Sequence, residues 1–144
     1  QIQYLGSSAL TLRDDGFTLY SGRQIPKETQ TIKVEKEIVS TFYDEDTIGL
    51  VFKNDSKDKL YTMQVYSTSG KLKFSKDFNI PYSTIRMSDG YIVMYNSSQI
   101  CVLNKNGTEK YFGNIDGTVK DFFKFGWNKY LLVLDTGVNV IKLS

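Results

Sequence analysis

A polar turn recurs along this chain about every forty residues. Each turn follows a short apolar run, and the equivalent positions in the four turns are Asp15, Asp55, Asn96 and Asp135. Their spacings are 40, 41 and 39 residues, which is regular enough to indicate an internal repeat. Asx and Gly residues accept the left-handed backbone angles of tight turns, so each turn is expected to join two antiparallel strands.

Each repeat contains four strand-like runs. In the second copy they cover residues 38–43, 50–52, 59–67 and 72–76. The second run is apolar at successive positions, as in a strand covered on both faces, whereas the fourth alternates and carries lysines. This gradient predicts sheets stacked face to face, with the last strand of each sheet at the rim. A β-propeller blade has this arrangement.

We therefore predict one all-β domain over residues 1–144, with about four propeller blades of four strands each. The predicted blades are residues 2–36, 37–81, 82–117 and 118–144. The last copy lacks a fourth strand, so we expect a partial propeller or half-ring whose remaining blades are encoded upstream or donated by a second copy. An ordinary β-sandwich is the alternative fold, but it does not explain the repeat of about forty residues. A helix over residues 27–39 is the local alternative, although alternation at Ile32 and Val34 favours a strand.

Composition excludes several classes of function. The chain has no histidine, which removes imidazole catalysis and histidine metal sites, and we expect no metal site. Its 18 basic and 16 acidic residues are scattered, unlike the clustered charge of a nucleic-acid-binding surface. No apolar run approaches the roughly 18 residues of a membrane span, so no membrane contact is expected from this segment. The single cysteine, Cys101, lies in an apolar run and is expected to be buried.

Three local motifs have two interpretations each. Asp135-Thr136-Gly137 matches the catalytic triplet of aspartic proteases, but it falls at the phase of the repeat turns, so a hairpin is the preferred interpretation. The acidic run 44–46 is expected to be a solvated turn rather than a cation site. The Asn-x-Ser/Thr triplets that begin at Asn54, Asn96 and Asn106 match glycosylation acceptors and also suit turns.

Propellers commonly hold their partners with the connections at one end of the ring. The equivalent connections here cover residues 43–46, 88–90 and 126–129. The candidate binding residues are Tyr43, Asp44, Asp89, Trp127 and Asn128. Trp127 is the only tryptophan, and burial between blades is the more usual role for such a residue. An exposed Trp127 would instead stack on a sugar or grip a peptide.

The phrases "SDGYIVMYNSSQICVLNKNG" and "NKYLLVLDTGVNVIKL" resemble divergent bacterial β-propeller repeats of the WD-repeat and quinoprotein-like type. With the Asn- and Lys-rich composition, the chain is similar to propeller proteins of Gram-positive Clostridia that carry a domain of unknown function behind an N-terminal membrane anchor. The resemblance implies an extracytoplasmic position in the bacterial cell envelope, anchored by a segment upstream. The repeated tryptophans of quinoprotein blades are absent, so no cofactor is expected.

The leading functional prediction is a non-catalytic interaction or sensing module that binds protein or glycan through its loops. No catalytic residue and no nucleic-acid partner are expected. A homodimer, or pairing with upstream blades, is expected. The alternative is a propeller enzyme of the glycosidase or dehydrogenase type. Such an enzyme would use carboxylates from several blades, and the candidates are Asp44, Asp89 and Asp121.

Overall fold

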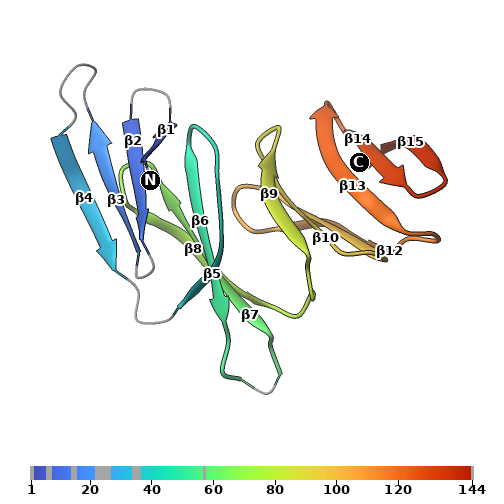
Figure 1. Cartoon of the computed structure of the whole chain (residues 1–144), viewed down its shortest axis with the longest axis horizontal. Coiled ribbons are helices and arrows are strands. Elements are labelled where there is room, and N and C mark those ends of the chain that lie inside the picture. The colour runs from blue at the N-terminus through green and yellow to red at the C-terminus, as the bar shows by residue number, and fades with distance from the viewer. Residues whose placement is uncertain are drawn as a thin grey trace. The chain divides into compact units, whose positions relative to one another are not determined.

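The computed structural model describes residues 2–5, 8–13, 16–21, 27–33, 37–56 and 58–143. Within these ranges all regular structure is β-strand, and the strands form antiparallel sheets in which neighbours follow in chain order (Figure 1). The predicted all-β architecture is confirmed. The chain divides into two compact units, Gln1–Asn79 and Ile80–Ser144, and each unit contains two sheets.

The first unit begins with a sheet of β1 (Ile2–Leu5), β2 (Ser8–Arg13), β3 (Gly16–Ser21) and β4 (Lys27–Lys33). Its second sheet consists of β5 (Ile38–Tyr43), β6 (Thr47–Lys53), β7 (Tyr61–Ser67) and β8 (Leu72–Phe78). The helix alternative is wrong for residues 27–33, which form β4. The predicted turn at Asp14 and Asp15, and residues 34–36 of the predicted fourth strand, lie outside the described residues.

The two sheets of the first unit pack through apolar side chains. Phe17 of β3 contacts a cluster formed by Ile48, Leu50, Phe52 and Tyr66 of the second sheet. The rings of Phe17 and Tyr66 meet edge to face, with 5.2 Å between their centroids. Residues 47–52 of β6 are all buried, as the unbroken apolar run predicts for a strand covered on both faces.

The second unit contains a four-stranded sheet of β9 (Thr84–Ser88), β10 (Tyr91–Tyr95), β11 (Gln99–Leu103) and β12 (Glu109–Asn114). Its other sheet has three strands in the described part of the chain, as predicted: β13 (Val119–Gly126), β14 (Lys129–Leu134) and β15 (Gly137–Lys142). Cys101 of β11 is buried, also as predicted.

The core of the second unit lies between its two sheets. The residues that meet there are Val93, Tyr95, Ile100 and Val102 from one sheet and Val119, Phe122, Tyr130 and Leu132 from the other. The rings of Phe122 and Tyr130 stack with 5.4 Å between their centroids. Burial of this face holds β13 against β9 and β10 and so positions the turns described below.

Turn chemistry explains the phase of the repeat. The Asn96 side-chain oxygen accepts hydrogen bonds from the Ser98 and Gln99 backbone N–H groups, at 2.9 and 2.8 Å. Asn54 caps its turn in the same way through the Ser56 N–H. Leu134 faces Gly137 across the β14–β15 hairpin, so Asp135 and Thr136 form its two-residue connection, and the hairpin interpretation is confirmed. No helix long and apolar enough to span a bilayer occurs among the residues that the structure describes.

Candidate functional site

In the second unit, Lys124 of β13 joins the β9–β10 turn to the β13–β14 turn. Its ammonium donates to Asp89 Oδ2 at 2.5 Å and to the Gly126 carbonyl oxygen at 2.8 Å. The Tyr91 ring lies below it, with 4.8 Å between Nζ and the ring centroid. The Lys124 side chain is only 6% exposed. A buried ammonium needs such partners, because its charge has lost most of its water.

Backbone geometry accounts for the residue types in both turns. Asp89 and Gly90 have φ angles of 48° and 80°, and Asn128 has a φ angle of 53°. Asp, Asn and Gly adopt this left-handed conformation at lower cost than other residues. Two of the predicted binding residues, Asp89 and Asn128, therefore have a structural reason to occupy their positions.

Trp127 is 84% exposed at the tip of the β13–β14 turn, so the prediction that it is buried is wrong. Burial is prevented because a two-residue connection between Gly126 and Lys129 leaves its side chain beyond the end of the sheet. With the Asn128 amide oriented to satisfy both its groups, the Trp127 indole N–H donates to it at 3.3 Å, and Asn128 donates to the Leu143 carbonyl at 3.3 Å. The indole is thus tethered at its edge while most of its surface stays open.

Tyr43 and Asp44 belong to the first unit, at the β5–β6 turn. Asp44 Oδ1 accepts a hydrogen bond from the Asp46 N–H at 2.9 Å, and the Asp44 N–H donates to the Thr47 carbonyl at 3.0 Å. These bonds build the turn, which agrees with the predicted solvated connection. Tyr43 is exposed at the end of β5.

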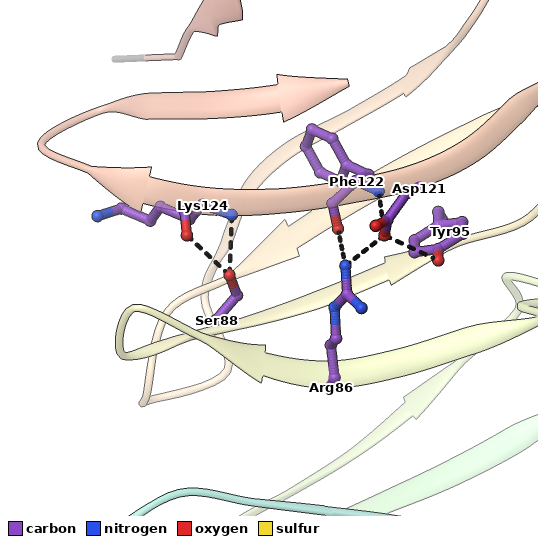
Figure 2. A network of polar contacts seen from close by, with 6 residues as sticks. All are labelled: Arg86, Ser88, Tyr95, Asp121, Phe122 and Lys124. Atoms are coloured by element: carbon purple, nitrogen blue, oxygen red, sulfur yellow. Dashed lines mark hydrogen bonds and ion pairs between the residues drawn. The ribbon is translucent and has the colours of Figure 1, made fainter. Parts of the chain in front are cut away.

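A second polar network joins the two sheets of the second unit, and Figure 2 shows its members. Arg86 of β9 donates through Nη2 to Asp121 Oδ1 at 2.5 Å and to the Phe122 carbonyl at 2.9 Å. Asp121 also accepts from the Tyr95 hydroxyl at 3.2 Å and from the Phe122 N–H at 2.8 Å. Beside this pair, Ser88 Oγ donates to the Lys124 carbonyl and accepts from the Lys124 N–H.

The charge state of Asp121 follows from these contacts. Burial opposes its ionisation, but the hydrogen bonds from Arg86, Phe122 and Tyr95 and the charge of Arg86 outweigh that effect. The pKa of the Asp121 carboxyl is therefore held below its usual value. Burial raises the pKa of the nearby Tyr130 to about 12, and electrostatic interactions with Tyr91 and Asp89 add to the rise.

Sequence reasoning did not identify Lys124 and Arg86, although they organise both networks. A period-two pattern through Phe122 and Lys124 places the lysine on the inward side of its strand, which was the available signal. Two of the three carboxylates considered for catalysis, Asp89 and Asp121, each bind a cation from the neighbouring sheet. The third, Asp44, belongs to the other unit.

Other places in the described part of the chain are weaker candidates for a functional site. No group of three His, Cys, Asp or Glu side chains converges there as metal ligands would. A shallow hollow of about 210 Å³ lies on the first unit, lined by Glu37, Val39, Lys53 and Asp55. These residues lie at the opposite end of the β5–β6 hairpin from Tyr43 and Asp44.

Comparison with known proteins gives the fold and the family. No curated protein matches the sequence. Among solved structures, BamB from Moraxella catarrhalis is similar with a TM-score of 0.64 and 12% identity over 99% of this chain and 44% of the BamB chain. BBS1N in complex with ARL6DN has a TM-score of 0.61 and 14% identity over 100% of this chain and 50% of that one. The WD40 β-propeller domain of Doa1 has a TM-score of 0.58 and 14% identity over 99% of this chain and 50% of the Doa1 chain.

These likenesses show the fold, which is a partial β-propeller, as predicted. The chain spans about half the length of the structures it matches. The model of a family of unknown function, DUF5711, matches residues 1–143, and the chain belongs to this family.

Proposed function

We propose that this chain is a non-catalytic interaction or sensing module that binds a protein or glycan through the turns of its second unit. The observation that carries the proposal is the 84% exposure of Trp127. Exposing so large an apolar ring to water is unfavourable, and such a ring is a common anchor in recognition surfaces.

The surroundings of Trp127 support the same function. Lys124 donates a hydrogen bond to the Gly126 carbonyl in the Trp127 turn, and the indole N–H donates to the Asn128 side chain. An anchor that is ordered before binding loses less conformational entropy when the ligand arrives. Asp89 lies at the neighbouring turn with its side chain about half exposed, and it adds a hydrogen-bond acceptor for hydroxyl or amide groups.

The proposed location is extracytoplasmic, in a bacterial cell envelope, with an anchor upstream of this segment. Its support is the resemblance of the repeats to anchored envelope propellers. Protease added to intact cells that make the natural protein should digest this segment, whereas a cytoplasmic protein in the same cells should survive. Protection of both until the cells are lysed would contradict the location.

The ligand-binding test uses Trp127, the only tryptophan, as its own probe. Titration with a panel of envelope glycans and with extracts of secreted proteins should find a ligand that shifts the Trp127 emission. Calorimetry with that ligand should then show that Trp127→Ala loses most of the affinity. The matched control is Phe112→Ala, which removes another exposed ring from the same unit and should bind normally. Unaltered affinity of Trp127→Ala would contradict the proposal that Trp127 anchors the ligand.

A propeller enzyme of the glycosidase or dehydrogenase type is the second candidate. It would need Asp44, Asp89 and Asp121 as reactive carboxylates, but Asp89 and Asp121 already neutralise buried or half-buried cations. Hydrolysis assays on the same glycan panel, with Asp89→Asn and Asp121→Asn as variants, separate a binding module from a glycosidase. Turnover by the wild-type chain that both variants abolish would favour the enzyme.

A further inference from the structure

Two lysines beside the Trp127 turn lie directly opposite each other. Lys129 at the start of β14 pairs in register with Lys142 at the end of β15, and both residues are exposed. Like charges at directly opposed positions of an antiparallel pair repel each other. No acidic side chain in the described part of the chain forms an ion pair with either lysine. The pair therefore costs stability in the free protein and presents two uncompensated charges to an anion.

The sheets of the first unit have no such charged pair at this position. The equivalent pairs join the start of the second strand to the end of the third. They are Ser8 with Ser21 in one sheet and Thr47 with Ser67 in the other. The repeat itself thus works with neutral hydroxyl residues here. A local departure that costs stability is expected where a chain serves a function besides folding.

Backbone contacts bring the lysine pair to the Trp127 turn. The Leu143 N–H, next to Lys142, donates to the Asn128 carbonyl at 3.0 Å. The Asn128 side chain also donates to the Leu143 carbonyl and accepts from the indole N–H, each at 3.3 Å. Since Lys129 follows Asn128 directly in the chain, the exposed indole and both lysines share one end of the β13–β15 sheet.

The contact that the indole offers to a ligand is apolar. Its one polar atom, Nε1, already donates to Asn128, so the exposed surface of Trp127 consists of ring faces and C–H edges. A pyranose ring has a face of C–H groups, which carry partial positive charge. Such a face packs well against the negative face of an aromatic ring.

The adjacent turn supplies an acceptor for sugar hydroxyls. Asp89 Oδ2 and the Gly126 carbonyl bind the same Lys124 ammonium, at 2.5 and 2.8 Å, so one bridge joins the carboxylate to the residue before Trp127. The Asp89 side chain is 49% exposed, and a carboxylate can accept several hydrogen bonds. Because Lys124 neutralises its charge, Asp89 attracts a cationic ligand weakly and suits a neutral hydroxyl donor better.

We propose that this surface, formed by Asp89, Trp127, Lys129 and Lys142, binds an acidic saccharide, a pyranose oligomer that carries carboxylate or phosphate groups. The inference rests on the proposed binding function and specifies its ligand class. One ring stacks on Trp127 and donates hydroxyls to Asp89. Its anionic group, or that of the next ring, binds between Lys129 and Lys142. An acidic peptide or a single-stranded nucleic acid would meet the same lysines, but neither has the adjacent ring hydroxyls that suit Asp89.

Calorimetry and Trp127 emission on the full chain should compare tetragalacturonic acid, a phosphomannan oligosaccharide and the neutral galactotetraose. At least one acidic probe should bind about tenfold more tightly than galactotetraose at low salt. Raising the ionic strength to about 0.5 M should remove most of that difference. Equal or weaker binding of both acidic probes overturns the proposal, and so does tighter binding of an oligothymidylate or a polyglutamate peptide.

Variants of the lysine pair test where the anion binds. Lys129→Gln and Lys142→Gln should each weaken binding of the acidic probe about threefold, and affinity for galactotetraose should stay unchanged. Lys120→Gln, which exchanges an exposed lysine at the other end of β13, is the matched control. Without ligand, the double variant should melt no lower than the wild type, because a repulsive pair is removed. Equal affinity of the wild type and the double variant for the acidic probe overturns the proposal.

Trp127→Ala separates this inference from the proposed function. Suppose that galactotetraose or the peptide binds as tightly as the acidic saccharides, and that Trp127→Ala abolishes this binding. The binding function then stands and the acidic ligand class is wrong. Binding of every probe that is insensitive to Trp127→Ala would overturn the proposed function itself.

Discussion

Arg86 on β9 and Asp121 on β13, 35 residues apart in the sequence, form an ion pair with 2.5 Å between Nη2 and Oδ1. The guanidinium also lies near the rings of Tyr95 and Phe123, at 5.9 and 5.6 Å from their centroids. Apolar packing alone allows neighbouring sheets to slide, because it is not directional. The ion pair and its hydrogen bonds fix the position of one sheet along the other.

Breaking this pair should destabilise the chain by a modest amount. Asp121→Asn and Arg86→Gln should each lower the free energy of unfolding by about 1–2 kcal/mol, because both side chains are partly open to water and screening weakens the pair. Urea unfolding of both single variants and the double variant measures the coupling between them. Asp116→Asn, at an exposed turn residue, is the control. Additive effects in the double variant would contradict a direct interaction.

Acid should remove the stabilisation that Asp121 provides. Its pKa in the folded chain is lowered, so the folded state favours the carboxylate more than the unfolded state does. The contribution is therefore complete above the unfolded pKa of about 4 and is lost as pH falls through the folded value. Melting temperatures measured between neutral and strongly acidic pH should fall less steeply for Asp121→Asn than for the wild type. Parallel curves would disprove this assignment.

Much of the fold could be predicted because its signals are local. The turn residue Asn96 caps its own turn, and the apolar run of β6 reports burial on both faces, so period and polarity locate strands without tertiary information. The start of β4 was less predictable, since the strand begins at Lys27, before the alternating residues that identified it. Propensity alone does not determine where an edge strand starts pairing.

The candidate site could be predicted only in part. Position in the repeat identified Asp89, Trp127 and Asn128, which do lie on adjacent turns. The partners Arg86 and Lys124 depend on which strands of neighbouring sheets meet, and that is a tertiary property. Trp127 was expected to be buried because of its residue type, yet the shortness of its turn decides its exposure.

Alkaline pH should destabilise the second unit through Tyr130. Its pKa in the folded chain is about 12, against about 10 when unfolded, so the stabilisation is present below pH 10 and is lost as pH rises from 10 to 12. Tyr130→Phe keeps the ring that stacks on Phe122 and removes the titrating hydroxyl. Thermal melts over this range should decline less for Tyr130→Phe than for the wild type.

The Phe42 ring leaves no room for a side chain at Gly49. A Cβ atom built at Gly49 of β6 would overlap the Phe42 ring, which covers it from the neighbouring β5 strand. Gly49→Ala should therefore lower the free energy of unfolding by about 2–3 kcal/mol, despite the better strand propensity of alanine. Phe42→Leu in the Gly49→Ala background should recover part of the loss. A Gly49→Ala chain as stable as the wild type in urea would contradict this packing.

Lys124 should control the mobility of the Trp127 turn. Its ammonium binds the Gly126 carbonyl, one residue before Trp127, and holds that carbonyl to Asp89 on the adjacent turn. Lys124→Met keeps the aliphatic stem over Tyr91 but loses both polar contacts, so the turn should move more freely while the core stays packed. Fluorescence anisotropy of the single tryptophan should fall in Lys124→Met and stay unchanged in Lys129→Met, where an exposed lysine beside the same turn is exchanged. Because Trp127 is already exposed, its emission maximum should hardly shift in either variant. Equal anisotropy in all three proteins would mean that the turn keeps its order without Lys124.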